Sequence, residues 1–517
     1  MPQNNTPHTE PNYSASNTET PLHSRMSSMS KQWLVVFSGK LSQQLFGFLT
    51  GVLIAKALGS AALGNYQLGI VIVHLLANVT IMGTDRGLMR YIPIFQKQHP
   101  GKAKSVIFDS LGLSFFVSLL LAVILFLGAE FIGTSFFDNE TFGRALRIFA
   151  FYLPAFTMWR LLVAVFDGLK RADIETPIQN ILTPGIFVLF LAGISLVKPA
   201  LMPVIWARIT AYSLACVLLA YLALRTFKPL FRAKSQSIDL RSYYAFSAPL
   251  LLISTLHLLM NHVDILLTGI YMTESDVGIY TIAQRMAILS LLGLQAINII
   301  FAPHISELFN DDKLQDMARL FKLFTRWIFI FSLLVFAFYI VFKKQLLSFF
   351  GAEFLAGQTA LMLLSIGQMI NALGGPNGTI LIMTGKQKWM LLNSVLMLIL
   401  NVIFNMLFIP RWGINGAALG TGLSIIIINV LKTAQLYHEL EIHPYNMVYL
   451  KSTAIIAGAT GLAWVMQQIV QFQGLGGAII GGFIFLILCI IGYWLFGQNE
   501  DDKIIIEFVR QKLRMGK

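Results

Sequence analysis

The sequence contains little charge and almost no cysteine. Asp, Glu, Lys and Arg together make up only 12% of its 517 residues, whereas about a quarter of a typical soluble domain is charged. The two cysteines, Cys216 and Cys489, each lie in an apolar run, so no disulfide framework and no metal-ligand spacing is visible. These absences argue against an ordinary water-soluble domain and give no sign of a redox function.

Long apolar runs make up most of the chain instead. Hydrophobic residues account for 56% of the sequence, and the mean hydropathy is +0.69. A helix needs about 20 apolar residues to cross a bilayer, and about fourteen such runs follow Lys31. The pattern predicts an all-α polytopic membrane protein with about 14 transmembrane helices. The predicted spans are 33–56, 65–84, 105–128, 147–167, 178–197, 203–224, 246–271, 277–301, 323–342, 358–384, 388–409, 414–436, 448–470 and 476–496.

Positive charges alternate between the connections. Lys and Arg are several-fold more frequent in every second connection, such as 86–104 and 225–241, than in the others. Since positively charged connections stay in the cytoplasm, the sequence predicts a multi-pass protein of the cytoplasmic (inner) membrane with both termini in the cytoplasm. The formal net charge of +13 then reflects orientation and attraction to the lipid bilayer, and nucleic-acid binding is not expected.

Signatures of catalysis are missing from the connections. The sequence has no glycine-rich loop ending in Lys-Ser or Lys-Thr, which argues against direct ATP hydrolysis. No predicted outer connection exceeds about twenty residues, and the first one, Ala57 to Gly64, contains no acid. Membrane glycosyltransferases and polysaccharide ligases usually carry a larger outer loop or an acidic catalytic motif. We therefore expect a protein that is not an enzyme.

Short motifs recur in the two halves of the chain. Phe37-Ser38-Gly39 recurs as Phe246-Ser247-Ala248, and Leu63-Gly64-Asn65-Tyr66 recurs as Val277-Gly278-Ile279-Tyr280. Six predicted helices separate the copies, so both have the same orientation in the membrane, as in parallel-repeat transporters. We expect two six-helix bundles around a central cleft, plus two C-terminal helices. The predicted regions are a disordered cytoplasmic tail (1–31), an N-terminal bundle (32–226), a cytoplasmic connector (227–242), a C-terminal bundle (243–439), two appended helices (445–498) and a cytoplasmic amphipathic tail (499–517).

Four full charges fall inside predicted spans, namely Lys40, Arg160, Arg208 and Arg285. A Lys or Arg at the bilayer centre costs roughly 2.5–3.5 kcal/mol on an insertion scale. We therefore expect these side chains to line an aqueous cavity, together with Gln44, which stands one turn after Lys40.

Structural explanations for the same residues remain open. Arg208 lies near a helix end, from which its side chain could snorkel to the interface. Arg160 could pair with Asp167, seven residues further along the same helix face. Lys40 and Gln44 could belong to a close contact between helices.

The seventh span is the most polar. His257, Asn261 and Asp264 have i, i+4, i+7 spacing and share one helix face. A carboxylate and a histidine could bind and release a proton, and the oxygen atoms could bind sodium. We expect these residues to couple transport to H⁺ or Na⁺, with no other cofactor; a polar seam between helices, or a counter-charge for one of the arginines, is the alternative.

Several short motifs carry a family resemblance. They are Leu58-Gly59, Leu63-Gly64-Asn65-Tyr66, Gly87-Leu88-Met89-Arg90-Tyr91 and Gly168-Leu169-Lys170-Arg171. With them the chain resembles the Wzx-type flippases of O-antigen and other polysaccharides. That superfamily also contains the multidrug and toxin extrusion antiporters and the lipid II flippase. The resemblance implies a polyprenyl-diphosphate-linked oligosaccharide as substrate, turned over from the cytoplasmic to the outer leaflet, with a glycan polymerase or other assembly proteins as partners.

The residues and the resemblance together suggest a mechanism. Lys40, Arg160 and Arg285, with Arg208 and Gln44 nearby, would replace the water around the diphosphate, while the two bundles rock between two openings. Two other functions stay open. One is a cation-coupled multidrug-type antiporter, which typically has twelve helices and an acidic cavity, and the other is a membrane scaffold that transports nothing.

Overall fold

A computed structural model describes residues 22–197, 199–445, 448–472 and 474–496, and the side chains of all of these except 22–38, 40–41, 299–300 and 494–496. Every regular element in these ranges is a helix, which confirms the all-α prediction. The helices are α1 (Leu22–Ile81), α2 (Thr84–Gln98), α3 (Pro100–Phe137), α4 (Glu140–Gly168), α5 (Ala172–Pro177), η1 (Ile178–Leu182), α6 (Thr183–Val197), α7 (Leu201–Thr226), α8 (Lys228–Arg232), α9 (Leu240–Tyr271), α10 (Glu274–Leu289), α11 (Leu292–Asn310), α12 (Leu314–Ser348), η2 (Ala352–Gly357), α13 (Gln358–Gly374), α14 (Asn377–Met383), α15 (Gln387–Leu440), α16 (Val448–Val470) and α17 (Gly474–Phe496).

Two long helices change direction at a glycine. Gly59 in α1 has φ 82° and Gly413 in α15 has φ 54°, a positive φ that glycine adopts without steric penalty. By length and composition, 11 helices in the described part of the chain could cross a membrane, or 12 if the bent pair α10 and α11 forms one span. If the two arms of α1 and of α15 are counted separately, the fold is compatible with the predicted fourteen spans.

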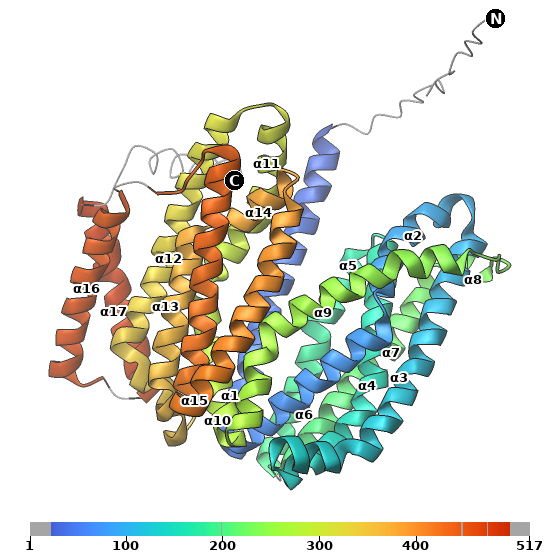
Figure 1. Cartoon of the computed structure of the whole chain (residues 1–517), viewed down its shortest axis with the longest axis horizontal. Helices are drawn as coiled ribbons and strands as arrows, with labels where there is room; N and C mark the ends of the chain where they lie inside the picture. Colours follow the sequence, from blue (N-terminus) through green and yellow to red (C-terminus); the bar gives the residue numbers. More distant parts are fainter. Residues whose placement is uncertain (1–21, 198, 446–447, 473, 497–517) are drawn as a thin grey trace, which may run out of the picture.

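The helices form two lobes (Figure 1). The N-terminal lobe contains α1 to α8, the C-terminal lobe contains α10 to α15, and α9 runs from one to the other. The first half of α9 bonds to the N-terminal lobe, where the Tyr243 and Ser110 hydroxyls are 2.7 Å apart. α16 and α17 pack against α12 at the outer edge of the C-terminal lobe. The largest apolar core fills the N-terminal lobe and continues into α10 and α13.

The lobes meet closely where α10 crosses the second arm of α1. A Cβ at Gly64 would lie 1.8 Å from the carbonyl oxygen of Glu274, and a Cβ at Gly278 would lie 2.0 Å from that of Ser60. Gly278 follows Gly64, and Glu274 follows Ser60, by the same 214 positions. The repeated motif therefore forms a nearly symmetric crossing that only glycine permits. The Ser60 backbone N–H also donates to Glu353 Oε1 in η2, at 2.6 Å.

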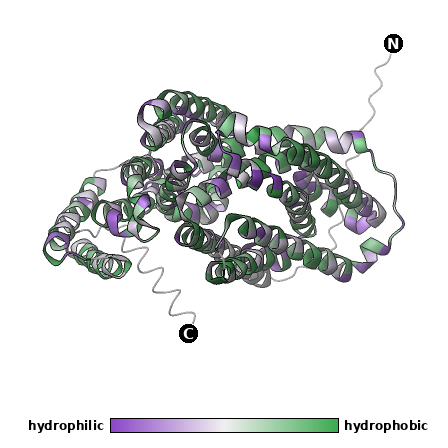
Figure 2. Cartoon of the chain, turned by 90° about the horizontal axis from the view of Figure 1, so that it is seen from below, coloured by the Kyte–Doolittle hydropathy of each residue, from purple (hydrophilic) through white to green (hydrophobic). Residues whose placement is uncertain are grey.

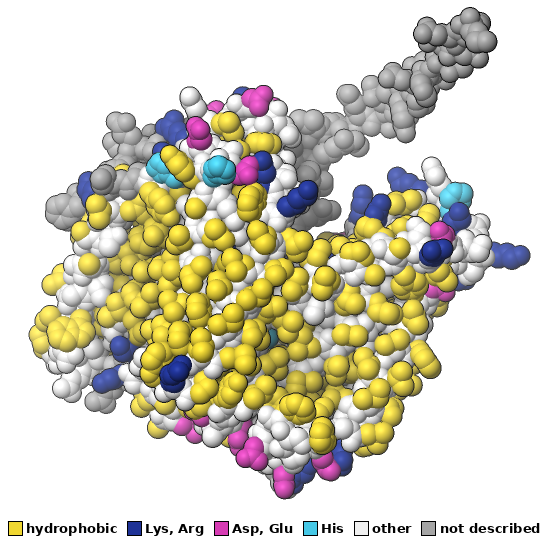
Figure 3. Space-filling model, in the orientation of Figure 1, with side chains coloured by type: hydrophobic (Ala, Val, Ile, Leu, Met, Phe, Trp, Pro, Cys, Tyr) yellow, Lys and Arg dark blue, Asp and Glu magenta, His cyan; other side chains and the backbone are white. Residues whose placement is uncertain are grey.

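The two ends of the molecule differ. We call the end with this crossing the closed end; it contains the connections near 57–62, 137–140, 271–275 and 348–358. The basic end, opposite to it, contains the connections near 82–104, 168–173, 226–240 and 310–314. Figure 3 shows a wide belt of hydrophobic side chains between the ends, and a notch between the lobes at the basic end. This belt and the apolar helices are those of a multi-pass membrane protein.

The predicted tails are described only in part. α1 begins at Leu22, so the helix starts before the predicted end of the N-terminal tail at residue 31. Residues 1–21 lie outside the described residues, as does the predicted amphipathic tail 499–517.

Candidate functional site

A cavity of about 470 Å³ lies between the lobes, and we call it the interlobe cavity. Its wall comes mainly from α1, α4, α6 and α7 of the N-terminal lobe, with one residue each from α9 and α10. Arg160, Arg208 and Arg285, three of the four predicted intramembrane charges, line it together. None of its described lining residues is acidic. Seen from below, hydrophilic positions also lie inside the helical assembly (Figure 2).

Arg208 lies in an aromatic box. The centroids of the Tyr66, Tyr152, Phe187 and Tyr212 rings are 5.7, 5.1, 5.5 and 5.0 Å from its guanidinium carbon, within the range of cation–π attraction. Its Nη1 donates to the Tyr66 hydroxyl at 2.8 Å, and its Nη2 to the Tyr212 hydroxyl at 3.3 Å. Its Nε is buried and has no partner among the described residues. Arg208 therefore does not snorkel to the interface, because its own lobe holds the side chain in the cavity wall.

Arg285 joins the lobes. It belongs to α10, but its Nη1 donates to the Gly47 carbonyl oxygen at 2.8 Å and its Nη2 to Gln67 Oε1 at 2.9 Å, on the two arms of α1. A Cβ at Gly51 would lie 2.8 Å from Nη1, so a glycine there leaves room for the guanidinium. Both of these partners are neutral, so no acidic side chain among the described residues bonds to Arg285.

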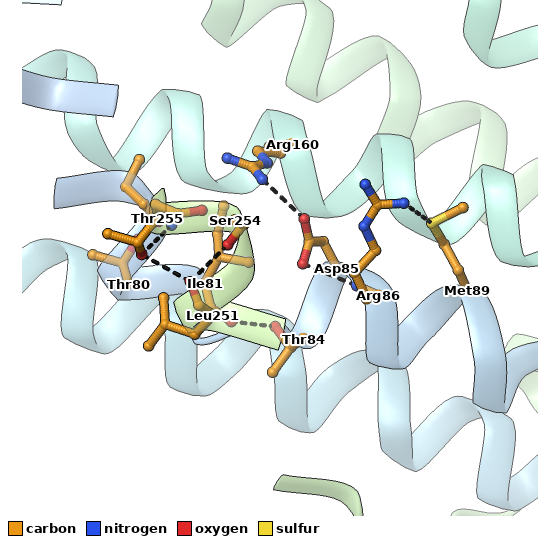
Figure 4. Close-up of polar contacts among 12 residues, drawn as sticks. Thr80, Ile81, Thr84, Asp85, Arg86, Met89, Arg160, Leu251, Ser254 and Thr255 are labelled. Atoms are coloured by element: carbon orange, nitrogen blue, oxygen red, sulfur yellow. Dashed lines mark hydrogen bonds and ion pairs between the residues drawn. The ribbon is translucent and has the colours of Figure 1, made fainter. Parts of the chain in front are cut away.

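Arg160 is the one cavity arginine with an acidic partner in the described part of the chain. Its Nη2 lies 3.0 Å from Asp85 Oδ2, with side-chain exposures of 30% and 11%. Figure 4 shows this pair bridging α4 and the start of α2. The alternative prediction, that Arg160 pairs with Asp167, is therefore wrong. Asp85 follows the left-handed Gly83 at the start of α2, and Gly83 turns the chain so that Asp85 faces α4.

Two histidines also line the cavity. The His74 ring stacks on Phe156 with centroids 4.3 Å apart. His74 Nε2 and His262 Nδ1 are both buried without a partner in the described residues. Sequence reasoning missed His74 because a lone histidine in an apolar span carries no spacing signal. The wall thus contains unsatisfied ring nitrogens as well as cations.

Two further predicted site residues, Lys40 and Gln44, are not found in the described cavity wall. The Lys40 side chain lies outside the described residues. Gln44 is half-buried but is not part of the cavity wall, whereas its neighbour Gln43 is.

Asp264 lies in the C-terminal lobe, where it is 2% exposed. Its Oδ2 accepts hydrogen bonds from the Tyr280 hydroxyl at 2.6 Å, from Gln284 Nε2 at 2.8 Å and from the Thr421 hydroxyl at 3.2 Å. Its Oδ1 accepts from the backbone N–H of Ile265 at 2.9 Å. Gln284, a neighbour of Arg285 in the sequence, is therefore a direct partner of this carboxylate.

The other two residues of the predicted ion-coupling face are apart from this network. His257 and Asn261 are exposed, and Asn261 Nδ2 donates to the His257 carbonyl oxygen at 2.6 Å. α9 leaves the N-terminal lobe along its length, so residues on one face of it meet different surroundings. Of the predicted three, Asp264 alone is buried.

The interlobe cavity has the chemistry of an anion site. Two of its arginines, Arg208 and Arg285, bond only to neutral oxygens, and guanidinium groups bind phosphate or carboxylate oxygens with several hydrogen bonds. No group of three or more His, Cys, Asp or Glu that could hold a metal occurs in the described residues. The arrangement favours an anion with several oxygen atoms.

Two family models match the chain. The model described as polysaccharide biosynthesis protein matches residues 29–309, more than half of the sequence. The model described as MatE matches residues 249–407.

Two proteins of Haloferax volcanii are similar in sequence. The chain is 25% identical over 169 residues to the "Probable low-salt glycan biosynthesis flippase Agl15", which covers 32% of this chain and 36% of that protein. It is 26% identical over 253 residues to the "Probable flippase AglR", which covers 44% of this chain and 50% of that protein. The matched part thus spans half or less of the length of either relative.

The fold is similar to a solved structure of "Lipid II flippase MurJ, inward closed conformation". The two share a TM-score of 0.71 at 15% identity, over 89% of this chain and 98% of the other. At that identity the likeness concerns the fold alone.

Proposed function

This chain belongs to the polysaccharide biosynthesis protein family, and from that premise we propose that it is a flippase for a glycan linked to polyprenyl diphosphate. It moves the diphosphate and sugars across the cytoplasmic membrane by alternating access, for polysaccharide export, and is not an enzyme.

One observation carries this proposal. Arg160, Arg208 and Arg285 come from three helices, yet they line one cavity whose described wall contains no acid. A diphosphate loses its hydration on entering the membrane, which costs many kcal/mol unless other groups replace the water. The three guanidinium groups supply those hydrogen bonds, and the polyprenyl chain stays in lipid.

The size of the interlobe cavity and the route into it fit a diphosphate head group with sugars. A cavity of about 470 Å³ lies within the range of small-molecule sites, about 300–1,000 Å³. The notch at the basic end leads toward the space between the lobes (Figure 3), whereas the crossing of Gly64 and Gly278 blocks the closed end. Transport then requires the lobes to separate at that crossing and to approach each other at the basic end.

The remaining parts of the proposal concern orientation, coupling and partners. With the basic end in the cytoplasm, both termini are cytoplasmic and the substrate enters from the inner leaflet. Any coupling to H⁺ or Na⁺ acts through Asp264, the buried carboxylate, and not through the exposed His257 and Asn261. A glycan polymerase or other assembly protein receives the product in the outer leaflet.

The test is to replace Arg208 and Arg285 by Gln, singly and together, in cells that lack the natural copy. Each single variant should reduce transport at least tenfold, since a charged hydrogen bond contributes about 1.5–3 kcal/mol. The measurement is the fraction of lipid-linked glycan retained in the inner leaflet, normalised to the amount of protein in the membrane.

Arg411→Gln is the matched control, because Arg411 is exposed and lies next to the break in α15 at the closed end. Its transport should equal that of the unmodified protein. Normal transport by the double arginine variant at normal protein levels contradicts the proposal. Drug sensitivity of the deletion strain without accumulation of lipid-linked glycan favours the antiporter function instead.

A further inference from the structure

A second cavity, of about 810 Å³, lies at the closed end of the C-terminal lobe. Its wall comes from α12, from η2 and the start of α13, and from α16 and the start of α17. It shares no lining residue with the interlobe cavity. In Figure 1, α16 and α17 lie beyond α12, on the side away from the N-terminal lobe. A ligand here would lie outside the space between the lobes.

Glutamine amides give this cavity unsatisfied acceptors. Gln345 of α12 and Gln467 of α16 both donate an amide N–H to the Phe472 carbonyl oxygen, at 3.1 and 3.3 Å. A carbonyl can only accept, so both amide nitrogens must face it and the orientation of both amides is fixed. The two amide oxygens are buried and have no partner among the described residues. Buried acceptors of this kind need donors, which a ligand with hydroxyl groups provides.

The charge of the wall is positive. Lys343 and Lys344 lie at the end of α12 on the cavity wall, and no described lining residue is acidic. Two adjacent ammonium groups attract a phosphate and repel a ligand that carries its own ammonium. The preferred ligand therefore combines one negative charge with hydroxyl donors.

The cavity wall also contains apolar residues and an exposed tryptophan. Ile340 and Val341 form its apolar side, and Trp464 on its rim is 51% exposed. Tryptophan is enriched where the hydrocarbon meets the head groups of a bilayer. A ligand here can keep its polar part among Gln and Lys while apolar chains continue into the belt.

We propose that this cavity binds the head group of an anionic phospholipid with free hydroxyl groups, of the phosphatidylglycerol type, from the leaflet at the closed end. The phosphate lies near Lys343 and Lys344, and the glycerol hydroxyls donate to the amide oxygens of Gln345 and Gln467. The bound lipid joins α12 to α16 and so holds the two appended helices on the C-terminal lobe. The site is independent of the proposed flippase function.

Native mass spectrometry of the full chain, titrated separately with phosphatidylglycerol, phosphatidylethanolamine and phosphatidylcholine, tests the site. Phosphatidylglycerol should be retained most tightly. The double variant Lys343→Gln with Lys344→Gln should bind it roughly thirtyfold more weakly, because each of the two basic residues near a membrane surface contributes about 1 kcal/mol toward an anionic lipid. A second variant, Gln467→Leu, removes an acceptor without changing the charge and should also weaken retention several-fold.

The control is Lys388→Gln with Lys451→Gln, which removes the same charge from exposed positions at the basic end. It should leave retention unchanged. Equal retention of the three lipids, or equal losses in both double lysine variants, overturns the proposal. Displacement of phosphatidylglycerol by a soluble oligosaccharide also overturns it, since the cavity would then recognise sugar and not lipid.

Discussion

Tyr66 and Tyr280 occupy equivalent positions in the two copies of the repeated motif, but they have opposite partners. In the N-terminal lobe, the Tyr66 hydroxyl accepts a hydrogen bond from Arg208 at 2.8 Å. In the C-terminal lobe, the Tyr280 hydroxyl donates to Asp264 at 2.6 Å. The same side chain in the same motif therefore stabilises a cation in one lobe and a carboxylate in the other.

The residues around Arg208 and those around Asp264 also differ in how many of their hydrogen-bonding atoms have partners. Asp264 receives four hydrogen bonds from its own lobe, so this carboxylate is satisfied without a ligand. Arg208 keeps a buried Nε without a described partner, and it faces a cavity. Buried polar groups that are fully bonded contribute to stability, whereas those left with free donors can bind a ligand. We therefore propose that the residues around Arg208 bind a ligand and that those around Asp264 mainly contribute to stability.

Replacing Asp264 by Ala should have the largest effect on stability. Gln284 and Thr421 would lose their acceptor in a dry interior, and Tyr280 would keep only the Thr421 hydroxyl at 3.4 Å. At about 1 kcal/mol for each lost hydrogen bond to Asp264, the total is roughly 3 kcal/mol. The thermal midpoint of the purified protein should fall by several degrees, and much further than in Arg208→Gln, whose partners can bond to water in the cavity. Equal falls in the two variants would remove the distinction between the lobes.

Asp264→Asn keeps the size of the side chain and one acceptor, so it separates stability from ion coupling. With a purely structural role for Asp264, we expect transport by this variant to be close to normal. Loss of the H⁺ or Na⁺ dependence of transport, with the thermal midpoint retained, would instead show that Asp264 has a coupling role in addition to its structural one.

The two equivalent tyrosines permit a matched test of intermediate size. Tyr280→Phe removes one of the four hydrogen bonds to Asp264 and should cost about 1 kcal/mol of stability while leaving transport unchanged. Tyr66→Phe keeps the cation–π contact but releases Arg208 Nη1, so transport should fall several-fold with a smaller change in stability. Both are measured as the thermal midpoint and as inner-leaflet accumulation of lipid-linked glycan. The same response from both variants would show that the motif has one role in both lobes.

Much of this fold could be predicted from the sequence, but contacts between helices could not, for physical reasons. Hydropathy located the spans because each must present about 20 apolar residues to lipid. The cost of intramembrane charge was the reason to expect four charged residues around one cavity, and three of them, Arg160, Arg208 and Arg285, line the interlobe cavity. The repeated glycines were visible in the sequence, although only the structure shows that Gly64 and Gly278 allow two backbones to touch.

The partners of the charges were harder to predict than the charges. Arg160 pairs with Asp85, 75 positions away, because contacts between helices depend on how the helices are rotated and packed. Helical spacing alone offered Asp167. The spacing of three polar residues on one face of α9, His257, Asn261 and Asp264, did not place them in one site for a related reason. α9 passes from one lobe to the other, so its successive turns meet different neighbours. Tyr66 could have been predicted as a site residue because it belongs to the repeated motif. Nothing in the sequence indicated that this motif lies at the cavity.

The smallest expected effect concerns an amide pair inside the C-terminal lobe. Asn393 and Gln435, on the two arms of α15, exchange hydrogen bonds of 2.7 and 3.0 Å and are both buried. Hydrogen bonds between membrane helices contribute about 0.6 kcal/mol each on average, so a double-mutant cycle of Asn393→Leu and Gln435→Leu should give a coupling energy near 1 kcal/mol, with transport unchanged in the double variant. Since the pair is reciprocal, each single variant should be less stable than the double, because it leaves one buried amide without its partner. A loss of transport in the double variant at normal stability would place function in the C-terminal lobe as well, against the division of roles between the lobes.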